Sequence, residues 1–157
     1  MHNLYTPRGA KTRDALVWVR HLNDTIELFG ERAEIVFGSH HWPRWGRKEG
    51  FDYISKQRDM YRYIHDQTVR LMNRGLTPTE ISNQLELPRS LGNEFYNRDY
   101  YGTVSHNSRA VYNFYLGFFD GNPALLNPQD PKTRAIKYLE LAGGEDSLMT
   151  VAKRALE

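Results

Sequence analysis

Apolar side chains recur at helical spacing near the start of the chain and again, over a longer stretch, in its middle. Asp14 begins the first of these patterns and Gly30 follows it, which predicts a helix over residues 14–29. A second helix is predicted over residues 51–74, ended by Gly75, with one apolar face. The residues of that face are Ile54, Tyr61, Ile64, His65, Thr68, Leu71 and Met72.

Shorter patterns predict further helices in the second half of the chain. Thr77, Pro78 and Glu80 form a helix start, because a Thr cap is followed by Pro in the first turn and by Glu three residues after the cap. Residues 91–99 show no regular period and are predicted to be irregular. The remaining predicted helices are one that follows residues 100–107 and buries Val111, Tyr115, Leu116 and Phe119, one from Asp130 to Gly143, and one that reaches Glu157.

One short segment predicts a strand among these helices. The apolar run 33–37 is typical of a buried strand, residues 38–46 of a loop, and residues 46–50 of a polar linker. A helix and a single strand cannot make a sheet, so this α/β unit either pairs with a copy of itself or ends a larger α/β domain. The predicted fold class is therefore mainly α, an all-α helical domain preceded by an α/β fragment.

The loop after the strand carries the first candidate chemistry, His40 and His41. Neutral imidazole binds zinc well, and the end of a strand fixes where the ring points. The alternative is a pair of surface histidines before an aromatic turn. A zinc site takes three or four ligands, so one or two histidines need further ligands from elsewhere.

Other polar residues give weaker signals. Arg8 and Arg13 lie in the turn-like opening of the chain, and guanidinium groups match the oxygens of sulfate, phosphate or carboxylate. Taken by themselves, they are better explained as solvated surface arginines. His65 lies on an apolar helix face, which indicates a hydrogen-bonded core histidine rather than a ligand. His106 lies near a predicted helix start, and we expect a structural role in the cap region.

The composition of the chain argues against several classes of protein. The 157 residues fit one domain or parts of two, and 39% hydrophobic residues suffice for a core. The formal net charge of +2 argues against a nucleic-acid-binding protein, even with 13% aromatic residues, because such proteins carry clustered positive charge. Without cysteine there are no disulfides and no thiolate zinc sites. No apolar run has the length of a membrane span, and no signal peptide is visible, so we expect no integral membrane association.

Several motifs in a fixed order resemble the linear alkyl sulfatase family of metallo-β-lactamase-fold enzymes. They run from about residue 3 to residue 144 and include SHHWPRWG at 39–46, KQRD at 56–59, HDQT at 65–68, LMNRG at 71–75, YYGTVSHN at 100–107 and GFFDGNP at 117–123. The resemblance implies a division of the chain. Residues 1–50 resemble the C-terminal part of the catalytic domain, and residues 51–157 resemble a truncated helical dimerisation domain.

The resemblance also implies a function and roles for particular residues. The family hydrolyses alkyl sulfate esters such as dodecyl sulfate with two zinc ions, and His40 matches its late zinc-ligand histidine, with His41 ranked second. Arg8 and Arg13 match a segment close to the active site: Arg8 is expected to bind the sulfate, and Arg13 to support it or pair with a carboxylate. Trp42 and Trp45 are expected to pack in the scaffold or to contribute to an apolar channel for the alkyl tail.

The same resemblance leaves open what this chain does by itself. The family's main zinc motif, His-x-His-x-Asp-His, and its acidic ligands are not in these residues. The expected function is therefore that of a fragment of a homodimeric alkyl sulfatase, inactive alone. The alternative is a stand-alone helical dimerisation or interaction module.

Overall fold

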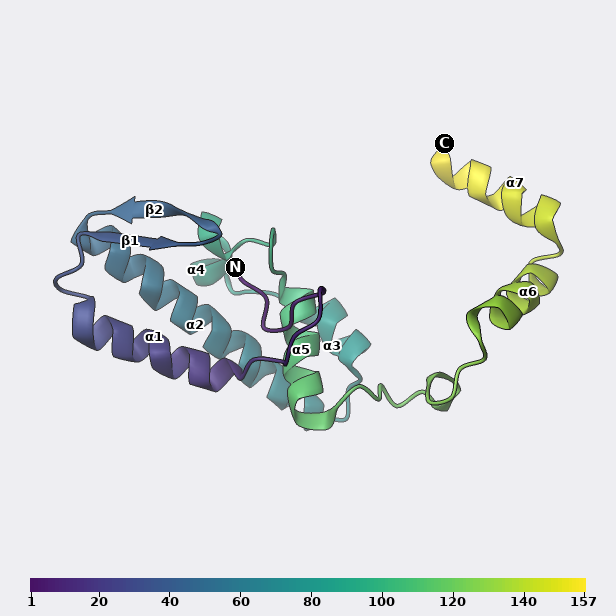
Figure 1. Cartoon of the computed structure of the whole chain (residues 1–157), viewed down its shortest axis with the longest axis horizontal. Helices are drawn as coiled ribbons and strands as arrows, with labels where there is room; N and C mark the ends of the chain where they lie inside the picture. The colour runs from purple at the N-terminus through teal and green to yellow at the C-terminus, as the bar shows by residue number, and fades with distance from the viewer. The chain divides into compact units, whose positions relative to one another are not determined.

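The computed structural model describes residues 1–157 and is mainly helical, with one two-stranded sheet (Figure 1). It divides into two compact units, Met1–Asp120 and Gly121–Glu157. The elements of the first unit are α1 (Ala15–Phe29), β1 (Ile35–Gly38), β2 (His41–Trp45), α2 (Arg47–Met72), α3 (Pro78–Gln84), α4 (Arg89–Gly92), the 3-10 turn η1 (Phe95–Asn97) and α5 (Val104–Leu116). Those of the second are the 3-10 turn η2 (Pro123–Leu125), α6 (Pro131–Leu141) and α7 (Glu145–Leu156).

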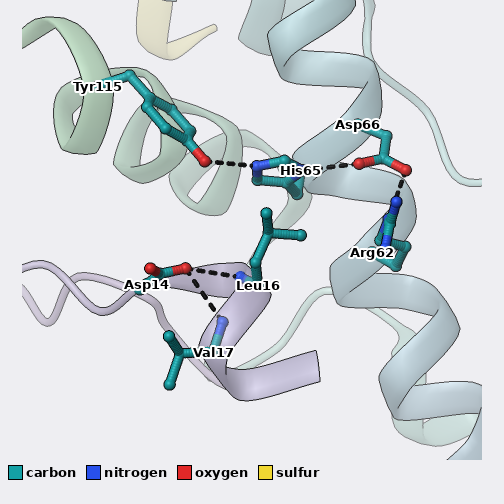
Figure 2. Close-up of polar contacts among 7 residues, drawn as sticks. All are labelled: Asp14, Leu16, Val17, Arg62, His65, Asp66 and Tyr115. Atoms are coloured by element: carbon teal, nitrogen blue, oxygen red, sulfur yellow. Dashed lines mark hydrogen bonds and ion pairs between the residues drawn. The ribbon is translucent and has the colours of Figure 1, made fainter. Parts of the chain in front are cut away.

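Most predicted helices are confirmed, with their capping signals in place. Asp14 caps α1, its carboxylate accepting hydrogen bonds from the backbone N–H groups of Leu16 and Val17 at 2.8 and 3.1 Å (Figure 2). Thr77 and Glu80 form a complete capping box at the start of α3. Gly75 ends the segment after α2 with φ of 82°, a left-handed conformation that glycine adopts without strain.

The core of the first unit lies where α1 packs along α2 and where α3 and α5 close over the far end of α2 (Figure 1). The apolar face predicted for α2 is confirmed, because Ile54, Tyr61, Ile64 and Leu71 are buried. The residues of the main buried cluster are Leu4, Ala15, Val19, Met60, Tyr61, Ile64, Leu71, Ile81, Leu85, Leu91, Ala110 and Val111. Leu4 joins the core from an irregular segment, which places the start of the chain inside the helical packing.

His65 is a buried, hydrogen-bonded residue of this core, as predicted. Its Nδ1 donates to Asp66 Oδ1 at 2.7 Å, and its Nε2 accepts from the Tyr115 hydroxyl at 2.8 Å (Figure 2). Arg62 Nε donates to the other carboxylate oxygen of Asp66 at 2.6 Å. The resulting row of four side chains ties the end of α5 to α2.

The region around residues 33–50 differs from the prediction. The expected loop contains the strand β2, which pairs antiparallel with β1 in the register Ile35 with Trp45 and Val36 with Arg44. β1 is not buried: Ile35 is 52% exposed and Phe37 is 77% exposed, because no third strand or helix of this chain covers the outer face of the hairpin. The expected linker 46–50 forms the first turn of α2, since Gly46 stands at its cap position.

Burial in α5, and at Phe119 just beyond its end, was also predicted only in part. Val111 is buried, whereas Tyr115, Leu116 and Phe119 are 46%, 57% and 39% exposed. Periodicity marks an apolar face correctly but does not say whether an element of the same chain covers it. Residues 91–99, expected to be irregular, contain the single-turn helix α4 at their edge and η1.

The second unit, taken by itself, has two helices whose apolar side chains are uncovered. α6 and α7 contain no buried residue. Ile136, Leu148 and Val151, three of their apolar side chains, are 50%, 47% and 59% exposed within this chain. No helix anywhere in the structure is long and apolar enough to cross a membrane.

The sequence-based division into residues 1–50 and 51–157 stays a prediction. Within the first unit, α1 and the hairpin pack against α2, so those 50 residues contact the helical region directly.

Candidate functional site

His40 lies in the two-residue turn that joins β1 to β2. Gly38 pairs with His41 across the hairpin, so Ser39 and His40 alone make the connection. The His40 side chain is exposed at this tip. Its ring stacks on that of Tyr101, with centroids 4.6 Å apart and planes at 16°. The turn therefore presents an imidazole whose orientation is supported from the segment before α5.

A row of ring contacts connects His40 with Arg13. The guanidinium carbon of Arg13 lies 5.7 Å from the centroid of the Trp18 ring. The Trp18 ring meets that of His2 at 5.7 Å, edge to face, and His2 meets His40 at 5.3 Å. The structure thus brings one predicted arginine and the predicted zinc ligand into the same cluster, through two residues that sequence reasoning did not select.

The surroundings of the His2 imidazole disfavour its charged form. Burial lowers the pKa of His2, the contact with the Asn3 carbonyl opposes this by less, and the positive charge of Arg13 lowers the pKa further. Its Nδ1 lies 3.3 Å from that carbonyl oxygen. The cluster therefore places two imidazoles and the Trp18 ring beside one guanidinium.

Two adjoining hollows open beside the His40 turn. One, of about 290 Å³, is lined by His2, Trp18, His40 and Tyr53 among others. The other, of about 630 Å³, has an aromatic wall of Trp42, Phe95, Tyr100 and Tyr101. Mostly apolar walls with a few polar groups are typical of sites that bind small molecules.

Trp42 and Trp45 do not pack in the scaffold of this chain. They are 79% and 65% exposed, so the expectation of scaffold packing is not met here. Trp42 lines the larger hollow, as the channel alternative requires.

The other predicted residues are Arg8, Arg13 and His41, and their surroundings differ. Arg8 is exposed in a turn closed by the hydrogen bond from Gly9 N to Thr6 O at 2.9 Å. Arg13 is half-buried and donates to the backbone carbonyl of Asn3. His41 is half-buried, and its Nδ1 lies 2.8 Å from Trp42 O, which commits that nitrogen to donation.

The residues fit a zinc ion only as contributors to a larger ligand set. The chain holds no group of three or more His, Cys, Asp or Glu side chains that could bind a metal ion together. His40, exposed and with its ring supported by stacking, has the chemistry of a single imidazole ligand.

Sequence reasoning missed His2 and Tyr101 for identifiable reasons. His2 stands near the start of a polar stretch with no periodicity, and nothing in the sequence indicates that residues 2–4 enter the core. Tyr101 belongs to the motif YYGTVSHN at 100–107, which entered the family resemblance without a role for Tyr101. Its position next to a helix start was visible, but its partner His40 is 61 residues away, and only the fold brings the two together.

Comparisons with known proteins give this geometry its context. The model of the alkyl sulfatase dimerisation family matches residues 77–157. A linear primary-alkylsulfatase from Pseudomonas is 48% identical over 98% of this chain and 23% of its own length. An alkyl/aryl-sulfatase of Saccharomyces cerevisiae is 45% identical over 97% of the chain and 24% of its own. The chain thus spans about a quarter of the length of the relatives it matches.

A solved structure shares the fold. It is that of a stereoselective inverting sec-alkylsulfatase from Pseudomonas, which is 43% identical and matches 99% of this chain and 25% of its own, with a TM-score of 0.92. The mainly helical fold is therefore that of a segment of an alkylsulfatase. The chain belongs to the alkyl sulfatase dimerisation family.

Proposed function

We propose that this chain is a segment of a zinc-dependent alkyl sulfatase that hydrolyses linear alkyl sulfate esters, such as dodecyl sulfate, to alcohol and sulfate. The observation that carries the proposal is the 48% identity, over nearly the whole chain, with a linear primary-alkylsulfatase. The ring cluster supports it, because an exposed imidazole, a nearby guanidinium and an aromatic hollow suit a site for an anionic head group with an apolar tail.

In this proposal His40 supplies one zinc ligand, and parts of the protein outside residues 1–157 supply the others. Two zinc ions, when bound, provide an activated water and offset charge on the departing sulfate. Tyr101 holds the His40 ring by stacking and so limits the directions in which its nitrogens point. The His40 side chain therefore loses its rotational freedom before metal binding rather than during it.

The arginines act on the sulfate. Arg8 carries a freely exposed guanidinium on a short turn and binds the ester's sulfate oxygens through paired hydrogen bonds. Arg13 is anchored by the Asn3 carbonyl and the Trp18 ring, so it supports the segment and adds positive charge rather than moving with substrate. The alkyl tail lies along the aromatic wall of Trp42, Phe95 and Tyr100.

Association of two copies completes the proposal. The family is one of dimerisation domains, and α6 and α7 leave apolar side chains uncovered within this chain. Burying this apolar surface against a second copy contributes about 25 cal/mol per Å². We infer a homodimer in which these faces are covered.

The alternative is a stand-alone dimerisation module without activity. It is favoured by the absence from this chain of a group of three potential metal ligands. The two functions make opposite predictions for the full-length protein, whereas both predict that residues 1–157 alone do not hydrolyse sulfate esters.

The deciding experiment is a sulfate-release assay on the full-length protein with dodecyl sulfate, with zinc content measured on the same sample. Activity that is removed by a chelator and restored by zinc supports the sulfatase. A folded full-length protein that contains zinc but releases no sulfate from any linear alkyl ester would contradict it, and absence of both zinc and activity would favour the module.

A further inference from the structure

The segment that carries the two arginines, residues 2–13, has no regular secondary structure, yet its beginning is buried. Asn3, Leu4 and Thr6 are 3%, 0% and 3% exposed. Irregular segments normally lie at the surface, because their backbone N–H and C=O groups need hydrogen-bond partners. The hydrogen-bond partners of residues 2–13 therefore decide where the segment lies. Most of these partners belong to the region that matches the dimerisation family.

Asn107, in the first turns of α5, is the central partner. Its side chain is fully buried. Its Oδ1 accepts from Leu4 N at 2.8 Å, and its Nδ2 donates to His2 O at 2.9 Å. One amide group thus pairs with the backbone on both sides of Asn3, as a neighbouring strand would. Tyr61 also holds this backbone in place, because its hydroxyl accepts a hydrogen bond from His2 N at 2.8 Å.

The turn before α5 holds the same stretch from another side. Asn3 Nδ2 donates to Tyr101 O at 2.9 Å. Gly102 is buried so closely against the segment that a Cβ there would lie 2.6 Å from His2 C and 2.7 Å from His2 O. A side chain at this position would displace backbone rather than a flexible side chain.

The C-terminal end of the segment, at residues 12–13, is also held beside Leu4 and α5. Arg13 N donates to Leu4 O at 2.9 Å, which closes residues 4–13 into a loop with Arg8 near its tip. Asn113 of α5 donates through Nδ2 to Thr12 Oγ1 at 3.1 Å. The position of the Arg8 loop is therefore fixed at both ends, and α5 provides a contact at each.

We propose that Asn107 is a positioning residue for the sulfate-binding loop, so that the dimerisation-family region forms part of the substrate-binding apparatus. The inference rests on the proposed sulfatase function. Asn107 does not touch substrate: it fixes the backbone of residues 2–4, and through them the place of Arg8 and Arg13. Small displacements of such groups cost large factors in rate, because binding geometry must match the reacting ester.

The chain offers a matched control, Asn97. It is equally buried, and its amide also makes two hydrogen bonds, accepting from Gln57 Nε2 at 2.6 Å and donating to Leu91 O at 3.1 Å. None of these partners belongs to residues 2–13. Asn97→Ala thus reproduces the loss of a buried amide without releasing the arginine segment.

The test compares Asn107→Ala with Asn97→Ala in the full-length protein, by steady-state kinetics on dodecyl sulfate, zinc content and hydrogen exchange of the amides of residues 4–13. We expect Asn107→Ala to lower kcat/KM by about ten- to a hundredfold, mainly through KM, with zinc retained and exchange in the segment accelerated. Asn97→Ala should leave KM within about twofold of wild type. Equal kinetic effects of the two variants, or an unchanged KM in Asn107→Ala, would overturn the inference.

A second pair of variants tests the inference even if Asn107→Ala misfolds. Gly102→Ala pushes on His2 without removing any hydrogen-bonding group, whereas Gly92→Ala adds a Cβ in ordinary contact with Leu87 at 3.5 Å. We expect KM to rise in Gly102→Ala and not in Gly92→Ala, and the opposite pattern would count against the inference. A wild-type protein that releases no sulfate overturns the proposed function instead, and hydrogen exchange then still decides whether Asn107 fixes the segment.

Discussion

The ring of His40 stacks on the ring of Tyr101, with their centroids 4.6 Å apart. His40 belongs to the hairpin within residues 1–50, and Tyr101 belongs to the region that matches the dimerisation family. The contact therefore joins the two predicted parts of the chain at the residue proposed to bind zinc. Together with the hydrogen bonds of Asn107, it indicates that the helical region supports the site as well as association.

Replacing His40 is expected to remove metal and activity together. His40→Ala in the full-length protein takes away one imidazole ligand, so we expect zinc content to fall and sulfate release to drop by more than about a hundredfold. His41→Ala is the control, since the Nδ1 of His41 already faces Trp42 O. Full zinc content and full activity in His40→Ala would show that the ligand assignment is wrong.

Replacing Arg8 is expected to weaken binding of the sulfate group. A charge-assisted hydrogen-bonded contact contributes about 1.5–3 kcal/mol, so Arg8→Ala should lower kcat/KM by about ten- to a hundredfold. Arg8→Lys should recover only part of this loss, because an ammonium group cannot make paired hydrogen bonds. Arg20→Ala, on the exposed side of α1, provides the control. Equal kinetics for Arg8→Ala and Arg20→Ala would contradict the assignment.

The Asp66 carboxylate is expected to stabilise the contact between α5 and α2 in a pH-dependent way. Burial raises the pKa of Asp66, but hydrogen bonds from Arg62 and His65 outweigh it and hold the pKa below its usual value. A lowered carboxyl pKa contributes stability above the unfolded pKa of about 4, and this stability is lost as pH falls through the folded value.

Asp66→Asn should therefore accelerate amide hydrogen exchange in the last turn of α5 at pH 7, and its difference from wild type should shrink below about pH 4. Glu27→Gln, on an exposed position of α1, controls for loss of one negative charge. A difference that persists unchanged at low pH would mean that the carboxylate's charge is not what stabilises the contact.

Charge placed on the uncovered face of α7 is expected to break the dimer. Leu148 is 47% exposed within this chain, and Leu148→Glu would put a carboxylate where a second copy buries an aliphatic side chain. We expect dimer dissociation to become easier by at least about tenfold, measured by sedimentation over a concentration series. Lys153→Glu changes charge on the same helix, and an equal effect of both variants would point to net charge rather than burial.

The sequence alone was enough to predict most of the helices and several of their ends, because caps and apolar periodicity are local properties. Asp14, Thr77 and Gly75 act where their side chains or backbone freedom predict. The core position of His65 also followed from its place on an apolar face. The family resemblance rested on ordered motifs, and the comparisons confirm it.

Only the tertiary structure decided how distant residues meet. β2 was predicted as a loop because Pro43 and the polar neighbours of the histidines hide its alternation, and pairing with β1 overrides that local signal. His2, Tyr101 and Asn107 carry no local mark of function, since their partners lie far along the chain. Burial of Phe37 or Tyr115 depends on which surfaces cover them, and periodicity records only that a face is apolar.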